Sequence, residues 1–174
     1  MFKEINTLVP FLKDPEREFH VRELSKILGI TPATTSKRLK ELKDLNILSY
    51  RKERILDFYK SNLESQEYKD LKVYFTILSL RKSGLINTIN KFYLKPTIIF
   101  FGSSSVGLDV KESDIDLVII SEKKGVIDNI KKFEKKLGRR LQFFVHKNIK
   151  DLKNNHLINN VLNGIVIQGE IKWI

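Results

Sequence analysis

Two short apolar runs, separated by a polar stretch, constrain the fold of this chain more than any other feature. Ile98–Phe101 and Asp116–Ser121 are each long enough for a strand, and neither has the length of a typical helix. Two aspartates, Asp114 and Asp116, stand two residues apart at the start of the second run. Because successive side chains of a strand point to opposite faces, both carboxylates should lie on one face of a sheet.

The residue types at the ends of these runs indicate a site for a cation and a phosphate. Two carboxylates on one face repel each other unless a cation lies between them. Mg²⁺ prefers oxygen ligands and usually takes one or two protein carboxylates together with substrate phosphates and water. Directly after the first run, Gly102 allows the backbone to approach a phosphate, and Ser103 offers an amide and a hydroxyl donor.

The spacing of these residues resembles the signature of the DNA polymerase β-type nucleotidyltransferase superfamily. Gly102-Ser103, a gap of ten residues and then Asp114-x-Asp116 match that signature, and the resemblance extends from about Pro96 to the end of the chain. It is closest to the minimal nucleotidyltransferases. The resemblance implies transfer of a nucleoside monophosphate from an NTP such as ATP to a hydroxyl acceptor. It also implies that Gly102 and Ser103 hold the β- and γ-phosphates, and that Asp114 and Asp116 are catalytic residues that bind Mg²⁺ (or Mn²⁺).

One position departs from this resemblance. The superfamily places a third carboxylate on a later strand, and by pattern Gln142, in the strand-like run 140–146, occupies that position. Glutamine carries no charge and cannot take a proton, so transfer should be weak or absent. General-base catalysis is worth about 10²–10⁴-fold in rate, so a site without the base could still react slowly. Asp109 or Asp151 could replace the carboxylate, although neither is predicted to lie on a strand. His146 could serve as the base, and a strand-end residue near solvent is the favoured alternative for it.

Helical spacing and turn residues organise the first third of the chain. Gly29 suits a left-handed helix cap, and Thr31-Pro32 is a typical helix start. The predicted elements are helices over 2–12, 21–28 and from Pro32 to near Asn46, and a hairpin of strands 47–51 and 54–59 around the tip Arg51–Arg54. The predicted buried faces are Val21, Leu24, Ile27 and Leu28 in the second helix and Thr35, Leu39 and Leu42 in the third.

This order of three helices and a hairpin resembles the winged helix-turn-helix DNA-binding domain, most specifically over HVRELSKILGITPATTSKRLKELKDLNIL. In such domains the second helix of the helix-turn-helix enters the major groove. The implied DNA-binding residues are Thr34, Ser36 and Lys37 at base edges, Arg38 and Lys40 at phosphates, and Arg51, Lys52 and Arg54 at the wing tip. The alternative is a winged helix used for protein contacts or dimerisation.

The remaining segments complete an α+β fold. A long helical stretch from Leu63 to about Tyr93 should break at Ser83-Gly84, and further helices are expected over 126–137 and 156–162, with a last strand in GIVIQG. We therefore expect an N-terminal winged helix-turn-helix domain at 1–62, a helical connector at 63–94 and a C-terminal nucleotidyltransferase-like domain, a mixed sheet with helices, at 95–174.

Composition narrows the class of partner and the compartment. The formal net charge of +11 favours a polyanion such as DNA, RNA or nucleotide phosphate, with an ordinary solvated basic surface as an equal alternative. Without cysteine the chain forms neither disulfides nor a thiolate metal site. No segment approaches the ~20 apolar residues of a membrane span, and the N-terminus lacks signal-peptide features. We therefore expect a cytoplasmic protein without a membrane partner.

Two functional hypotheses follow. The first is a DNA-binding regulator whose nucleotidyltransferase domain binds Mg²⁺ and NTP with weak or absent transfer. The alternative is an active Mg²⁺-dependent enzyme that adds NMP to a protein or nucleic-acid hydroxyl, similar to antitoxins that modify a partner toxin. The expected partners are DNA and nucleotide, together with either a toxin-like protein or a second copy of the chain.

Overall fold

The computed structural model describes residues 2–171, with side chains from Asn6 onward. Contacts divide the chain into two compact units, Met1–Lys72 and Val73–Ile174. The division falls inside helix α4 (Gln66–Lys82), and hence within the predicted connector. The first residue of the predicted N-terminal domain and the last three of the predicted C-terminal domain lie outside the described residues.

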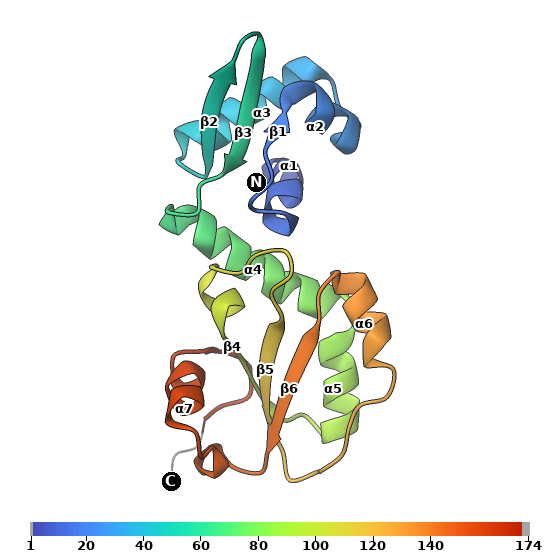
Figure 1. The fold of residues 1–174 in the computed structure, drawn as a ribbon. Coiled ribbons are helices and arrows are strands. Elements are labelled where there is room, and N and C mark those ends of the chain that lie inside the picture. The colour runs from blue at the N-terminus through green and yellow to red at the C-terminus, as the bar shows by residue number, and fades with distance from the viewer. Residues whose placement is uncertain (1, 172–174) are drawn as a thin grey trace. The chain divides into compact units, whose positions relative to one another are not determined.

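The first unit contains three helices and a three-stranded antiparallel sheet, followed by the start of α4 (Figure 1). Its elements are α1 (Phe2–Lys13), β1 (Phe19–His20), α2 (Val21–Leu28), α3 (Pro32–Asp44), β2 (Leu48–Glu53) and β3 (Leu56–Ser61). The strand order is β1-β3-β2. The three helices and the hairpin occur in the predicted order, whereas β1, with two residues, is too short to show a sequence period.

Backbone caps set the ends of α2 and α3 where the sequence predicts them. Gly29 ends α2 in the left-handed conformation at φ +64°. Thr31 accepts a hydrogen bond from the Thr34 amide at 3.2 Å, and Pro32 is the first residue of α3. After α3, Asn46 adopts φ +59° and turns the chain toward β2.

The buried face of α2 differs from the predicted one. In α3, the side chains of Thr35, Leu39 and Leu42 are buried as predicted. In α2, Leu24 is buried, but Ile27 is 53% exposed and Ser25 is buried instead. Ser25 Oγ donates to the Arg22 carbonyl at 2.8 Å, which satisfies the buried hydroxyl within its own helix. The prediction for Ile27 is therefore wrong, because a helix of two turns has too few residues for spacing alone to define its buried face.

The hairpin is longer than predicted, and its turn lies closer to the C-terminus. Glu53 pairs with Leu56, so the turn consists of Arg54 and Ile55. Arg54 takes the positive φ of +54° that a tight two-residue turn requires, although no glycine is present. Of the predicted tip residues Arg51–Arg54, the first three lie within β2.

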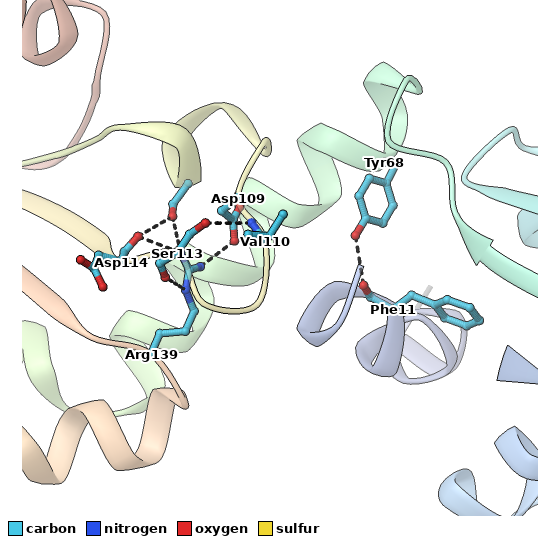
Figure 2. A network of polar contacts seen from close by, with 8 residues as sticks. Phe11, Tyr68, Asp109, Val110, Ser113, Asp114 and Arg139 are labelled. Carbon is cyan, nitrogen blue, oxygen red and sulfur yellow. Dashed lines mark hydrogen bonds and ion pairs between the residues drawn. The ribbon is translucent and has the colours of Figure 1, made fainter. Parts of the chain in front are cut away.

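A buried carbonyl joins three elements of the first unit. Phe11 is fully buried and packs edge-to-face on Phe19, with ring centroids 5.0 Å apart. The Phe11 carbonyl accepts hydrogen bonds from Tyr68 Oη at 3.1 Å and from Ser61 Oγ at 3.2 Å. Figure 2 shows the Tyr68 hydroxyl directed at this carbonyl. The start of α4 and the end of β3 are thereby held against α1.

The second unit is a four-stranded mixed sheet with helices. After α4 it contains α5 (Leu85–Tyr93), β4 (Thr97–Phe101), η1 (Ser103–Val106), β5 (Ile115–Ile120), α6 (Ile130–Leu137), β6 (Leu141–His146), η2 (Ile149–Asp151), α7 (Asn155–Leu162) and β7 (Ile165–Gln168). The strand order is β6-β5-β4-β7, with β5 and β6 parallel and the other pairs antiparallel. Within residues 2–171, none of the helices combines the length and the apolar character needed to cross a bilayer.

Two helix boundaries test the sequence predictions for this unit. The predicted break at Ser83-Gly84 is confirmed, since α4 ends at Lys82 and α5 starts at Leu85, with Gly84 at φ +85° between them. The predicted start of the next helix at residue 126 is wrong. That helix, α6, begins at Ile130, after Asn129 in the left-handed conformation.

Helices cover both faces of the sheet (Figure 1). Ile115 and Leu117 of β5 pack on one face with side chains of α5 and α6. Val118 packs on the opposite face with side chains of η2 and α7. Asp116 shares the face of Val118, because both are even-numbered residues of one strand. The residues on either side of Asp116 are therefore buried in the core.

Candidate functional site

The chain turns sharply where β4 ends, and hydrogen bonds within the turn hold it. Gly102 adopts φ +77° and ψ −168°, a conformation that residues with a Cβ rarely adopt. Its carbonyl accepts hydrogen bonds from the Ser105 amide at 3.1 Å and the Ser105 hydroxyl at 2.8 Å. Ser103, the first residue of η1, is exposed. The turn therefore presents the Ser103 hydroxyl to solvent directly after the strand.

Asp116 lies against this turn. In the antiparallel pair of β4 and β5, its register partner is Phe101, the residue before Gly102. A Cβ on Gly102 would come within 2.3 Å of Asp116 Oδ2, so the carboxylate occupies the space that any other residue at position 102 would need. The structure thus brings the glycine–serine turn and the second aspartate together.

Gln142 contacts the first aspartate. In the parallel pair of β5 and β6, Gln142 is the register partner of Asp116. Its Nε2 donates a hydrogen bond to Asp114 Oδ2 at 2.5 Å. An ionised carboxylate only accepts hydrogen bonds, so the amide nitrogen must be the atom that faces it. Gln142 therefore stands beside both aspartates, where the superfamily resemblance implies a third carboxylate.

The two aspartates influence each other electrostatically. Burial raises the pKa of Asp116, and the neighbouring Asp114 carboxylate raises it further, whereas Arg139 opposes the shift. A divalent cation between the carboxylates would relieve this repulsion. Within the part of the chain that the structure describes, no three His, Cys, Asp or Glu side chains are grouped to hold a metal. Asp114 and Asp116 are thus the two carboxylates that could hold a cation in this part of the structure.

Arg139 belongs to the surroundings of the site, and sequence reasoning did not find it. Its Nη1 donates to Asp109 Oδ2 at 2.7 Å, an ion pair in which the Arg139 and Asp109 side chains are 13% and 3% exposed (Figure 2). Asp109, which could replace the third carboxylate by sequence, is engaged in this buried ion pair instead. The partners are 30 residues apart in the chain, and no local pattern links them.

His146 and Asp151 are also too far along the sheet to replace the third carboxylate. His146 pairs with Ile120, four residues along β6 from Gln142, which corresponds to roughly 13 Å of strand. Asp151 Oδ2 accepts a hydrogen bond from the Asn148 amide at 2.9 Å, in a capping box of η2. His146 thus ends β6, as the favoured alternative has it, and Asp151 caps the turn that follows the strand. Neither residue takes the place of the third carboxylate.

The residues that the winged-helix resemblance assigns to DNA bases and phosphates lie along α3. The exposed ones are Thr34, Lys37 and Lys40, whereas Ser36 and Arg38 are half-buried. Thr34 Oγ1 is hydrogen-bonded to Thr31 Oγ1 at 2.9 Å, within the helix cap. Arg38 Nη1 donates to Thr7 Oγ1 of α1 at 3.4 Å. Lys37 and Lys40 are therefore the cations of this set that are presented to solvent.

Arg51 of the hairpin is engaged in ion pairs. It donates from Nε and Nη2 to Glu18 at 2.9 and 2.6 Å, and from Nη1 to Glu53 at 2.5 Å. The hydrogen bond from Arg51 lowers the pKa of Glu18, which keeps this carboxylate ionised. Lys52 and Arg54 are exposed.

Comparison with known proteins identifies the type of domain that carries the glycine–serine turn and the aspartates. The family model described as "Nucleotidyltransferase domain" matches residues 82–167. This range runs from the end of α4 into β7 and includes the whole candidate site. A search of the curated proteins found no match. The second unit therefore carries a nucleotidyltransferase domain.

Replacing Gly102 by alanine should disrupt the site in two ways. Alanine is strained at φ +77°, and its Cβ would displace the Asp116 carboxylate. We expect a loss of stability of about 1–3 kcal/mol and at least a ~10-fold loss of Mg·ATP affinity, measured by thermal unfolding and titration calorimetry. Gly84→Ala is the matched control, because Gly84 has φ +85° and open space around its Cα. Equal Mg·ATP affinity in both variants would contradict the assignment.

As the pH falls, cation binding should weaken at a higher pH than it would if Asp116 had the ordinary pKa of an aspartate. Because the pKa of Asp116 is raised, the folded metal-free protein takes up a proton there more readily than the unfolded chain. In the metal-free protein, the protonated carboxyl therefore stabilises the fold at low pH, and this contribution is lost as the pH rises through the raised pKa. The affinity for Mn²⁺ rises with pH instead, because the cation binds the ionised carboxylate. Mn²⁺ binding followed by electron paramagnetic resonance from about pH 4 to 8 tests this. A midpoint at or below the normal aspartate pKa would argue against it.

Proposed function

We propose that this chain is a DNA-binding regulator whose nucleotidyltransferase domain binds Mg²⁺ (or Mn²⁺) together with an NTP such as ATP and transfers the nucleotide weakly or not at all. The observation that carries this proposal is the meeting of Asp116 with Gly102, beside Asp114 and Gln142. The match of the nucleotidyltransferase domain to this region supports it.

The donor set fits a divalent cation bound with a nucleotide. Asp114 and Asp116 would supply carboxylate oxygens, and the Ser103 hydroxyl with the amides of the turn would face phosphate oxygens. When bound, the cation would neutralise charge on the phosphates. The close approach of Asp116 to the turn supports this fit, since a glycine there leaves room for the carboxylate and for close approach of a phosphate.

Gln142 supports weak rather than efficient transfer. A carboxylate at this position could take the proton of an attacking hydroxyl, and a neutral amide cannot. Gln142 also uses its nitrogen to occupy an oxygen of Asp114, at 2.5 Å, so one acceptor position of a candidate metal ligand is already engaged. Such a site suits binding of a nucleotide better than its turnover.

The first unit supports the DNA-binding part of the proposal. Its order α1-β1-α2-α3-β2-β3 resembles a winged helix-turn-helix, with α3 as the recognition helix and the β2–β3 hairpin as the wing. Lys37 and Lys40 are exposed along α3, and Lys52 and Arg54 are exposed on the hairpin. A net charge of +11 favours association with a polyanion.

An active nucleotidyltransferase is the second candidate function. The presence of Gly102, Ser103, Asp114 and Asp116 in one place favours it, because these are the residues that the superfamily uses to hold the metal and the NTP. The acceptor would be a hydroxyl of a protein, such as a toxin-like partner, or of a nucleic acid. The two candidates differ in one measurable quantity, the rate of nucleotide transfer.

Gln142→Glu should convert binding into transfer. We expect the wild type to bind Mg·ATP in titration calorimetry and to label acceptors in cell lysate slowly with [α-³²P]ATP. The variant should label them faster, by up to about 10²–10⁴-fold, because a carboxylate restores the base. Asn159→Asp, which adds the same charge on the exposed surface of α7, is the control for net charge.

Asp116→Asn supplies the test of the metal site in the same experiments. The variant should bind Mg·ATP only as tightly as the wild type binds ATP when EDTA has removed the metal. Equal binding by wild type and Asp116→Asn would refute the metal assignment. A wild type that labels acceptors as fast as Gln142→Glu would favour the second candidate function instead.

DNA binding should depend steeply on salt and on the exposed lysines of α3. We expect duplex fragments from the protein's own locus to bind with an affinity that falls as salt rises. Lys37→Ala with Lys40→Ala should weaken binding, and loss of the phosphate contact of Lys40 should reduce the log–log salt slope by about 1. Lys43→Ala is the control, since Lys43 of the same helix is paired with Asp44 at 3.2 Å. Fluorescence anisotropy measures both quantities, and an affinity insensitive to salt would exclude DNA as the partner.

A further inference from the structure

We propose that Arg139 is a positioning residue that holds the segment Ser103–Asp114 in the conformation in which Ser103 and Asp114 face the same ligand. This inference rests on the proposed nucleotide and metal binding of the second unit. It assigns a role to a side chain that lies between α6 and β6 and that the proposed function does not use.

The guanidinium of Arg139 contacts the segment at its beginning, middle and end (Figure 2). Nη2 donates to Ser104 Oγ at 2.5 Å and to the Asp114 carbonyl at 2.8 Å. Nη1 donates to Asp109 Oδ2, and Nε donates to the Ser113 carbonyl, both at 2.7 Å. One planar group thus fixes four points of a single connection between β4 and β5.

Apart from Arg139, the bonds that hold this connection are mostly local, with one between its ends, from Ser104 Oγ to the Asp114 carbonyl at 3.0 Å. The 3₁₀ turn η1 ends at Val106, and no helix or strand follows before Ile115. A local turn is closed by hydrogen bonds between Val110 and Ser113, from Val110 N to Ser113 Oγ at 2.9 Å and from Ser113 N to Val110 O at 3.1 Å. Without the four contacts of Arg139, ligand binding would have to order more of this backbone, and the lost conformational entropy would weaken the affinity.

The contacts of Arg139 lie close in the chain to the groups proposed to bind the ligand. Ser104 follows Ser103, and its hydroxyl also donates to the Asp114 carbonyl at 3.0 Å. The Asp114 carboxylate is held separately by Gln142 at 2.5 Å, three residues after Arg139 in the chain. The junction of α6 and β6 therefore fixes Asp114 at both its backbone and its side chain. The fork of donors is essential here, because a lysine has one nitrogen and could not reach all four acceptors.

The charge balance identifies the variants that separate positioning from stability. Asp109 is almost completely buried, so removal of Arg139 alone would take an ion-pair partner from a buried carboxylate and would destabilise the fold. Arg139→Met combined with Asp109→Leu removes both charges. We expect this double variant to recover most of the thermal stability that Arg139→Met loses, and not to recover Mg·ATP affinity.

The experiment measures amide hydrogen exchange of residues 103–114 and Mg·ATP affinity in the full chain. For Arg139→Lys, which keeps the charge and loses the fork, we expect faster exchange in this segment and at least a ~10-fold weaker affinity. Ile89→Ala, on the buried face of α5, is the control for stability and should lower the melting temperature without altering either readout.

Each outcome bears on the proposal. Unchanged exchange of residues 103–114 in Arg139→Lys would overturn it, as would a double variant that regains both stability and Mg·ATP affinity, because a purely structural role predicts that recovery. A wild type that does not bind Mg·ATP would defeat the proposed function instead. Hydrogen exchange of the ligand-free protein would then still decide whether Arg139 orders the segment.

Discussion

The contact between the Asp116 carboxylate and Gly102 is the constraint on which the rest of the candidate site depends. Position 102 needs a positive φ at the end of β4, and the space beside its Cα is filled by Asp116 Oδ2. Only glycine meets both conditions. The antiparallel register of β4 and β5 produces this contact, because it pairs Phe101 with Asp116 and carries the next residue past the carboxylate. Ser103 then emerges into solvent beside two acidic groups, an arrangement that suits a cation with a phosphate.

The neutral residue at position 142 affects both the charge repulsion among the carboxylates of this site and the groups available to take a proton. The Asp114 carboxylate already adds to the raised pKa of Asp116, and a third carboxylate would increase the repulsion in the metal-free protein. Gln142 removes that repulsion and adds a hydrogen bond to Asp114. The same amide cannot accept a proton from an attacking hydroxyl. These two properties of Gln142 are the basis of the proposal that the site binds a nucleotide and transfers it weakly or not at all.

The ion pairs of the two units differ in burial and in their effect on neighbouring groups. The Arg139–Asp109 pair is buried and fixes backbone carbonyls, so its effect is geometric. The pairs of Arg51 with Glu18 and Glu53 are exposed, and exposed pairs contribute little to stability. Their main consequence is to neutralise a cation on the hairpin and to leave Lys52 and Arg54 as its solvent-facing charges in the wing proposed to contact DNA.

Local patterns in the sequence determined the helices of the first unit, their caps at Gly29, Thr31 and Asn46, and the strands on either side of the Gly-Ser and Asp-x-Asp residues. These features follow from backbone sterics and side-chain periods that act within a few residues. Tertiary structure alone decided the exposure of Ile27, the partners of Arg139 and the separation of His146 from the aspartates. Those outcomes depend on which surfaces meet after folding, and on contacts between residues about 30 positions apart, for which a single sequence carries no local period.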